Sequence, residues 1–113
     1  MSRPNESEEW LDELVFSWTE VYKKSMTTLV LLRVVDERGP IATDGIAAEL
    51  QERTGWGLTE RGLYRTLRRL ASSGLLATTE EAAARTGVKR KLFTLTGVGR
   101  QYLERLNAAA VPG

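Results

Sequence analysis

The sequence contains no cysteine and no histidine. Without cysteine there are no disulfide bonds and no thiolate metal ligands, and cysteine usage does not indicate whether the protein resides in an oxidising or a reducing compartment. Without histidine the commonest general base of enzymes is missing, and a metal site would need carboxylates alone. The sequence also shows no converging group of carboxylates and no glycine-rich phosphate loop. We therefore expect no enzymatic activity, no metal and no cofactor.

Long hydrophobic runs are lacking as well. The most apolar segment, residues 26–35, is interrupted by Thr27, Thr28 and Arg33 and is too short to span a bilayer. The first residues, MSRPNESEEW, lack the basic and then apolar order of a signal peptide. With 113 residues, 42% hydrophobic and 27% charged, the chain has the size and composition of one folded domain. We expect a cytoplasmic protein without a membrane span.

The net charge of +1 conceals an asymmetry between the two parts of the chain. Residues 1–53 hold 6 basic and 11 acidic side chains, a balance of −5, whereas residues 54–113 hold 10 basic and 4 acidic ones, a balance of +6. A polyanion is therefore expected to meet the C-terminal part and to be repelled by the N-terminal part.

The segment LTERGLYRTLRRLASSGLL, residues 58–76, predicts a helix with two unlike faces. Thr59 stands where an N-cap belongs, and Gly74 stands where a left-handed turn would end the helix. The leucines at 63, 67 and 70 share one face, and arginines gather near the opposite face. They are Arg61, Arg65, Arg68 and Arg69. No carboxylate lies within residues 61–70 to pair with them. The pattern favours a recognition helix for a DNA groove over the alternative, a solvated basic surface.

The helices before this segment have different patterns. Residues 8–24 predict an amphipathic helix, which we expect to be followed by a second, deeply buried helix over residues 25–38 that ends at Gly39–Pro40. The apolar stripe of the first helix consists of Trp10, Leu11, Leu14, Val15, Trp18, Val21 and Tyr22. Phe16 lies outside the stripe. The stripe packs either on its own domain or, as Phe16 modestly favours, in a subunit interface.

A helix-turn-helix is expected at the centre of the chain. Ile41 is expected to form a brief strand, and a helix capped by Thr43 or Asp44 is expected to run to about Thr54. Its inward positions are Ile46, Ala47 and Leu50. Gly55-Trp56-Gly57 forms the turn before the basic helix, with Trp56 as a packing residue rather than a ligand contact.

After Gly74 the pattern becomes extended. Residues 75–79 and 89–95 predict a hairpin around a loop at residues 80–88, which contains Arg85 and Gly87. A hairpin directly after a recognition helix is a wing, and Lys89, Arg90 and Lys91 would lie near a DNA backbone or minor groove. The alternative is an edge strand kept soluble by charge.

Thr96 is expected to cap a last helix over residues 97–109. Its apolar side consists of Val98, Tyr102, Leu103 and Leu106. The predicted fold is mostly α-helical with a small β-hairpin wing, an α+β winged helix-turn-helix with an extra N-terminal helix and a short C-terminal helix. We divide it into an N-terminal extension at 1–24, a DNA-binding domain at 25–96, and a C-terminal helix and tail at 97–113.

The chain resembles the PadR family of bacterial winged-helix transcriptional regulators. The resemblance is carried by RTGWGLTERGLYRTLRRLASSGLL, residues 53–76, and by RKLFTLTGVGR, residues 90–100. It departs from the family where ATDGI replaces H-G-Y-E-I at residues 42–46 and where ERG replaces Pro-Gly-Thr at 60–62. Arg65 also replaces a proline. The helix thereby gains Arg61 and Arg65 where DNA contacts would be made, so the DNA sequence preference of the family does not transfer.

The resemblance implies a homodimer that binds double-stranded DNA in the bacterial cytoplasm, most simply as a transcriptional repressor on a pseudo-palindromic operator. The candidate DNA contacts are Thr59, Arg61, Tyr64, Arg65, Arg68, Arg69, Lys89, Arg90 and Lys91. The candidate dimer interface, or pocket for a small aromatic effector, consists of Trp10, Leu14, Phe16, Trp18, Val21, Tyr22, Tyr102 and Leu106. Interface packing is favoured over the effector pocket. The alternative function is a protein-interaction or architectural module without operator recognition.

Overall fold

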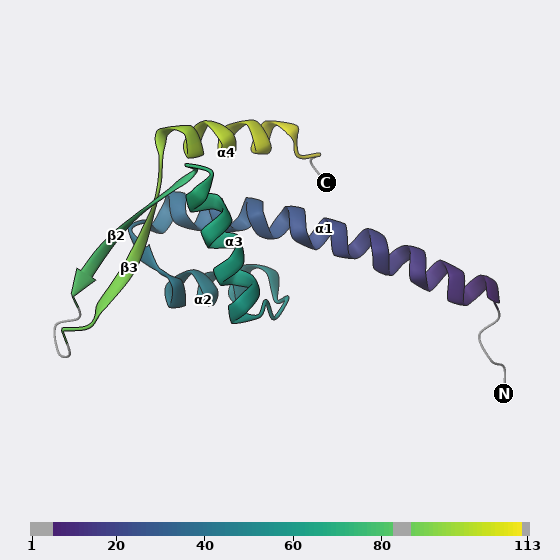
Figure 1. Ribbon diagram of the computed structural model, residues 1–113. Coiled ribbons are helices and arrows are strands. Elements are labelled where there is room, and N and C mark those ends of the chain that lie inside the picture. The colour runs from purple at the N-terminus through teal and green to yellow at the C-terminus, as the bar shows by residue number, and fades with distance from the viewer. Residues whose placement is uncertain (1–5, 83–86, 112–113) are drawn as a thin grey trace.

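The computed structural model describes residues 6–82 and 87–111. In these residues the order of elements is α1 (Glu6–Arg38), β1 (Ile41–Ala42), α2 (Thr43–Thr54), α3 (Glu60–Ser72), β2 (Leu76–Ala82), β3 (Lys89–Leu95) and α4 (Gly97–Ala109) (Figure 1). The strands form an antiparallel sheet in the order β1-β3-β2. Helices α2 and α3 form the helix-turn-helix, and β2 with β3 forms the wing. The predicted fold class is confirmed.

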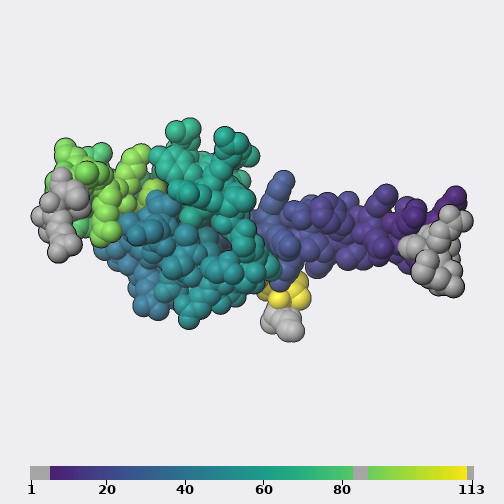
Figure 2. All heavy atoms as spheres, turned by 90° about the horizontal axis from the view of Figure 1, so that it is seen from below, coloured from purple at the N-terminus to yellow at the C-terminus, as the bar shows by residue number. Residues whose placement is uncertain are grey.

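Helix α1 is one continuous helix, so the prediction of two separate helices meeting at residues 24–25 is wrong. No glycine or proline stands near this point, and Ser25 is tolerated inside a helix, so the backbone hydrogen bonds continue. Its two halves have different surroundings. The C-terminal half runs through the domain, whereas the N-terminal half extends beyond every other element (Figures 1 and 2).

The core surrounds the C-terminal half of α1, which confirms the prediction that this segment is the most buried. Within the described residues no polar or charged side chain is buried. The core side chains are Leu29, Leu31, Leu32, Val34, Val35, Ile46, Leu50, Leu63, Leu67, Leu70, Leu76, Phe93 and Leu103. They come from all four helices and from the wing strands, so one apolar cluster holds α3 and the wing on α1.

Two details of α2 differ from the expectation. Its N-cap is Ala42, without a side-chain cap, instead of Thr43 or Asp44. The carboxylate of Asp44 accepts the backbone N–H of the next residue, Gly45, at 2.9 Å. Ala47 is exposed instead of inward, because Ile46 and Leu50 already fill the face that meets α1 and α3.

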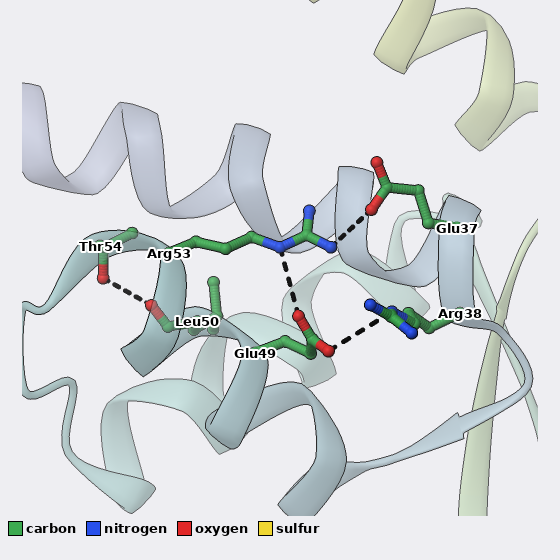
Figure 3. Close-up of polar contacts among 6 residues, drawn as sticks. All are labelled: Glu37, Arg38, Glu49, Leu50, Arg53 and Thr54. Atoms are coloured by element: carbon green, nitrogen blue, oxygen red, sulfur yellow. Dashed lines mark hydrogen bonds and ion pairs between the residues drawn. The ribbon is translucent and has the colours of Figure 1, made fainter.

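The sequence Arg53-Thr54-Gly55 ends α2 and fixes it to α1 (Figure 3). The Arg53 guanidinium forms ion pairs with Glu37 of α1 and Glu49 of α2, and the hydrogen bond to Glu37 raises the pKa of Arg53. The Thr54 hydroxyl donates to the Leu50 carbonyl at 2.8 Å. Gly55 has φ +69°, which suits glycine at a helix end. This part of the family motif is therefore structural.

The end of α3 and the start of α4 meet at one junction. Thr96 Oγ1 lies 2.7 Å from the Gly74 carbonyl, to which it donates, and it accepts the N–H of Gly99 at 2.9 Å. A Cβ atom at Gly99 would lie 2.0 Å from the Leu75 carbonyl oxygen, so this close approach requires glycine. The predicted N-caps Thr59 and Thr96 and the turn at Gly74, with φ +79°, are confirmed.

Helix α4 lies on α1 through polar contacts as well as apolar ones. Arg33 donates two hydrogen bonds to Asn107, and Arg100 pairs with Asp36. Of the predicted apolar side of α4, Leu103 is buried and Leu106 half-buried, whereas Tyr102 and Val98 are exposed. Val98 was assigned wrongly because Gly99, rather than Val98, faces the junction.

The wing differs slightly from its predicted bounds. Strand β2 begins at Leu76 and continues to Ala82, so residues 80–82, predicted as loop, are strand. Strand β3 has the predicted bounds, and the brief strand expected at Ile41 is β1, Ile41–Ala42, which pairs with β3. The predicted loop residue Arg85 lies outside the described residues. No helix in the described part of the chain is long and apolar enough to cross a membrane.

Candidate nucleic-acid interface

Helix α3 is held rigidly by its caps and by one buried face. The Thr59 hydroxyl accepts the N–H of Gly62 at 3.0 Å. At the other end, the N–H groups of Gly74 and Leu75 donate to the carbonyls of Ala71 and Leu70, a Schellman turn. Its inward face is fully packed, with the leucines at 63, 67 and 70 exposed by only 2%, 1% and 4%. The direction of the outward face is therefore fixed.

The outward face carries the four predicted arginines, and all four are exposed. Within residues 6–82 and 87–111 none of them forms an ion pair with a carboxylate. Because a guanidinium has five N–H donors and a permanent charge, this face offers many uncompensated donors to an anion. Seen from below in Figure 2, side chains of α3 stand out from the body of the molecule.

The four arginines divide into two sets. Arg61 and Arg68 line a shallow surface depression with Tyr64, and the Arg68 guanidinium lies over the Tyr64 ring at 5.8 Å from its centroid. Arg69 lies at the edge of this face that is nearest to α1, where its Nη2 donates to Thr28 Oγ1 of α1 at 3.4 Å. Arg65 lines both surfaces. The sequence pattern brought the four together on one face but did not reveal this division.

A groove of about 970 Å³ lies between α1, the turn before α3, α3 and α4. Lys23 and Lys24 of α1 line it together with Arg65 and Arg69, and Glu20 is its one acidic lining residue, so basic side chains of two helices meet in it. Trp56 and Tyr102 also line this groove, but Trp10, Phe16 and Trp18 do not. Sequence reasoning missed the two lysines because it assigned them to the polar side of a separate helix.

The wing carries its predicted basic residues beside acidic ones. In the ladder between β2 and β3, Glu80 is opposite Lys91 and Glu81 is opposite Arg90. Lys89 Nζ lies 3.8 Å from the Glu80 carboxylate. Directly opposite residues of a ladder share a face. All five side chains are exposed, so the positive charge of the wing is largely compensated, unlike that of α3.

The predicted stripe on α1 is wholly exposed. Trp10, Trp18 and Val21 are exposed by 60%, 66% and 66%, and Phe16, outside the stripe, by 64%. Trp18 stacks on Tyr22 with ring centroids 5.3 Å apart, and Tyr22 meets Trp56 edge-on at 6.0 Å. Trp56 therefore packs, as predicted. The stripe does not pack on its own domain except at this aromatic cluster.

Helices joined by a short turn, with a rigid basic helix followed by a β-hairpin, define a winged helix-turn-helix protein. The sequence profile of the transcriptional regulator PadR-like family matches residues 31–105, and the chain belongs to this family. The match leaves out the projecting half of α1.

Solved structures are similar to the chain over most of its length. A PadR-like transcription factor from Bacteroides fragilis has a TM-score of 0.69 and 26% identity, with 82% of this chain and 87% of that chain covered. A PadR-like transcriptional regulator from Bacillus cereus has a TM-score of 0.68 and 21% identity, with 77% of this chain and 82% of that chain covered. Bacillus subtilis PadR, solved in complex with operator DNA, has a TM-score of 0.65 and 22% identity, with 76% of this chain and 50% of that chain covered. No curated protein sequence matches the chain significantly.

Proposed function

We propose that the protein is a sequence-specific DNA-binding transcriptional regulator. The observation that carries this proposal is the rigid outward face of α3, with four exposed arginines that form no ion pair with a carboxylate of the described residues. Arginine recognises guanine bidentately in the major groove and also binds phosphates. Further support comes from Bacillus subtilis PadR, a protein of the same fold that was solved in complex with operator DNA.

The division of the arginines suggests a division of roles. Arg61, Arg65 and Arg68 project into the major groove, where one or two of them read guanine. Arg69, which is turned toward Thr28, binds a phosphate at the edge of the groove. Thr59 and Tyr64 are proposed phosphate contacts. Lys89, Arg90 and Lys91 are proposed backbone contacts of the wing, weakened by the carboxylates opposite them.

We further propose that the protein acts as a homodimer. Its radius of gyration is 17.7 Å, whereas a compact chain of this length would have about 13 Å. The excess comes from the projecting half of α1, whose apolar stripe would be costly to leave in water. The proposed interface consists of the stripe with Tyr102 and Leu106 of α4. Phe16 lies outside the stripe, so it belongs to the proposed interface only if the partner subunit also contacts the opposite face of α1.

A homodimer with two recognition helices binds a pseudo-palindromic operator, with half-sites on the order of 34 Å apart. Repression is the proposed mode, because a bound dimer would occlude a promoter. Interface packing accounts for the aromatic side chains of α1. A small aromatic effector bound by Trp10, Phe16 or Trp18 stays a prediction.

The test is selection of bound sequences from random duplex DNA at two salt concentrations. A regulator enriches a palindrome, and its affinity falls steeply as salt rises. Binding that depends on salt but enriches no sequence would indicate an architectural protein. Absence of binding at low salt would overturn the proposal, and the exposed stripe of α1 would then point to a protein-interaction module.

A further inference from the structure

The projecting half of α1 carries an apolar pattern that reads the same in both directions. Leu11, Leu14, Trp18 and Val21 follow one another at intervals of three, four and three residues. This is the spacing of the a and d positions of a coiled coil. All four side chains are exposed. The interval series is unchanged when the helix is reversed, so two antiparallel copies present matching patterns to each other.

We propose that two copies of the chain pair antiparallel through this half of α1, centred on residue 16, and that this pairing sets the distance between the two recognition helices. The proposal rests on the homodimer proposed above and specifies its geometry. In this register Leu11 is at the level of Val21 of the partner subunit, and Leu14 is at the level of Trp18 of the partner subunit. Trp10 comes level with Tyr22 of the partner subunit, beside the aromatic cluster.

The charges of α1 favour the same direction. The N-terminal part of the helix holds five carboxylates and no basic residue, at Glu6, Glu8, Glu9, Asp12 and Glu13. Lys23 and Lys24 stand at the other end of the stripe, where Glu20 is the single carboxylate, so that end has a net charge of +1. Antiparallel pairing brings the acidic part of each helix level with the lysines of its partner. Parallel pairing would instead set five carboxylates beside the same five, which is unfavourable.

The register also predicts the spacing of the DNA-binding helices. Contact between Arg69 and Thr28 marks the level at which α3 lies along α1. With a rise of 1.5 Å per residue, Thr28 is about 18 Å along the axis from residue 16, so the two recognition helices are separated by about 36 Å along α1. One turn of B-DNA separates half-site centres by about 34–36 Å. The spacing that this register predicts thus matches one turn of B-DNA.

Phe16 is not needed in this pairing. At 100° per residue it lies about 180° from the middle of the stripe, although it stands at the centre of the paired segment. Its exposed fraction, 64%, is nearly that of Trp18, 66%. The two aromatic residues therefore form a matched pair, of which only Trp18 faces the partner helix.

The absence of cysteine makes the register directly testable by cross-linking. We expect the double variant Leu11→Cys/Val21→Cys to form covalent dimers with a short bifunctional maleimide, because residues 11 and 21 of different copies are level. Each single variant should remain unlinked, because two copies of residue 11, or of residue 21, are about 15 Å apart along the axis. Linking of both single variants would show parallel pairing and overturn the proposal.

Sedimentation of the unmodified chain and of each variant separates this proposal from the homodimer itself. Variants that sediment as dimers but give no cross-link in the double variant would contradict the register and leave the homodimer standing. A monomeric unmodified chain would overturn both.

A charge exchange gives a second readout that needs no cysteine. Lys23→Glu/Lys24→Glu should weaken the dimer at low salt, and adding Glu8→Lys/Glu9→Lys should restore it. Failure of this restoration would contradict antiparallel pairing.

Discussion

At the scale of single residues, Arg65 occupies the middle of the outward face of α3 and lines the surfaces on both of its sides. It replaces a proline of the family pattern, so its contacts are a property of this chain. Arg65 also lies in the N-terminal half of α3, the part of a recognition helix whose residues contact base edges.

We expect Arg65→Ala to weaken binding to the selected operator by about 1–3 kcal/mol, and binding to random DNA by less. Fluorescence anisotropy with both duplexes measures the two losses. Arg65→Lys is the matched control, because it keeps the charge but loses the bidentate fork. Equal losses on the two duplexes would assign Arg65 to phosphate contact alone.

Gly99 tests the junction that fixes α4. A methyl group at this position would collide with the Leu75 carbonyl, whereas one at Gly97, two residues earlier in the same helix, would meet nothing within 4 Å. Gly99→Ala should therefore lower the free energy of unfolding by roughly 1–3 kcal/mol, the usual cost of overpacking. Gly97→Ala is the control. Urea unfolding measures both, and equal midpoints would contradict this account of the junction.

At the scale of elements, α3 and the wing differ in how their positive charge is balanced. The arginines of α3 form no ion pair within the described residues, whereas the wing residues face Glu80 and Glu81 across the ladder. Next to Lys89–Lys91 the sheet consists of β2 and β3 alone, because β1 pairs only with Leu92 and Phe93. The outer wing is thus a two-stranded ribbon with nearly compensated charge.

If the wing contacts the DNA backbone, Lys91→Ala should weaken operator and random DNA equally and lower the slope of log affinity against log salt by about 1. The matched variant Glu80→Gln removes the carboxylate opposite Lys91 and should strengthen both. Titrations at several salt concentrations give the slopes. An unchanged slope in Lys91→Ala would support the other interpretation, in which these charges keep an edge strand soluble.

At the scale of the whole molecule, the globular part and the projecting half of α1 have opposite charge, and we propose separate tasks for them. Acidic residues predominate before residue 54 and basic residues after it. The recognition helix therefore lies in the positive part of the chain, and the acidic N-terminal part of α1 is expected to be repelled by DNA and to remain with its partner subunit.

Trp18→Ala should loosen the dimer, because it removes the more exposed of the two tryptophans of the stripe and its stacking on Tyr22. Phe16→Ala, which removes an equally exposed aromatic residue from the other side of the helix, should change the dimer much less. Sedimentation equilibrium over a range of concentrations gives both dissociation constants. An unchanged dimer in Trp18→Ala would show that the stripe is not the interface.

Local sequence patterns were sufficient to predict those features of the molecule that depend only on residues close to one another in the chain. The caps at Thr59 and Thr96, the left-handed turn at Gly74 and the two faces of α3 depend on residues a few positions apart, so their sequence determines them. The alternating pattern after Gly74 located the wing for the same reason. The prediction of two helices in place of α1 was wrong. The change from an amphipathic to a nearly all-apolar pattern between Lys24 and Met26 resembled a helix boundary, although no residue there breaks a helix.

Tertiary structure decided what depends on distant segments meeting. Arg69 turns toward Thr28, Lys23 and Lys24 join the arginines in one groove, and Gly99 meets Leu75, all across separations that no local pattern encodes. The compensation of the wing charges likewise required the ladder register. The sequence by itself thus determined which helix would carry the arginines. Packing of α3 on α1 decided which of these arginines remain without a contact to α1, and how far α3 lies from the end of the stripe.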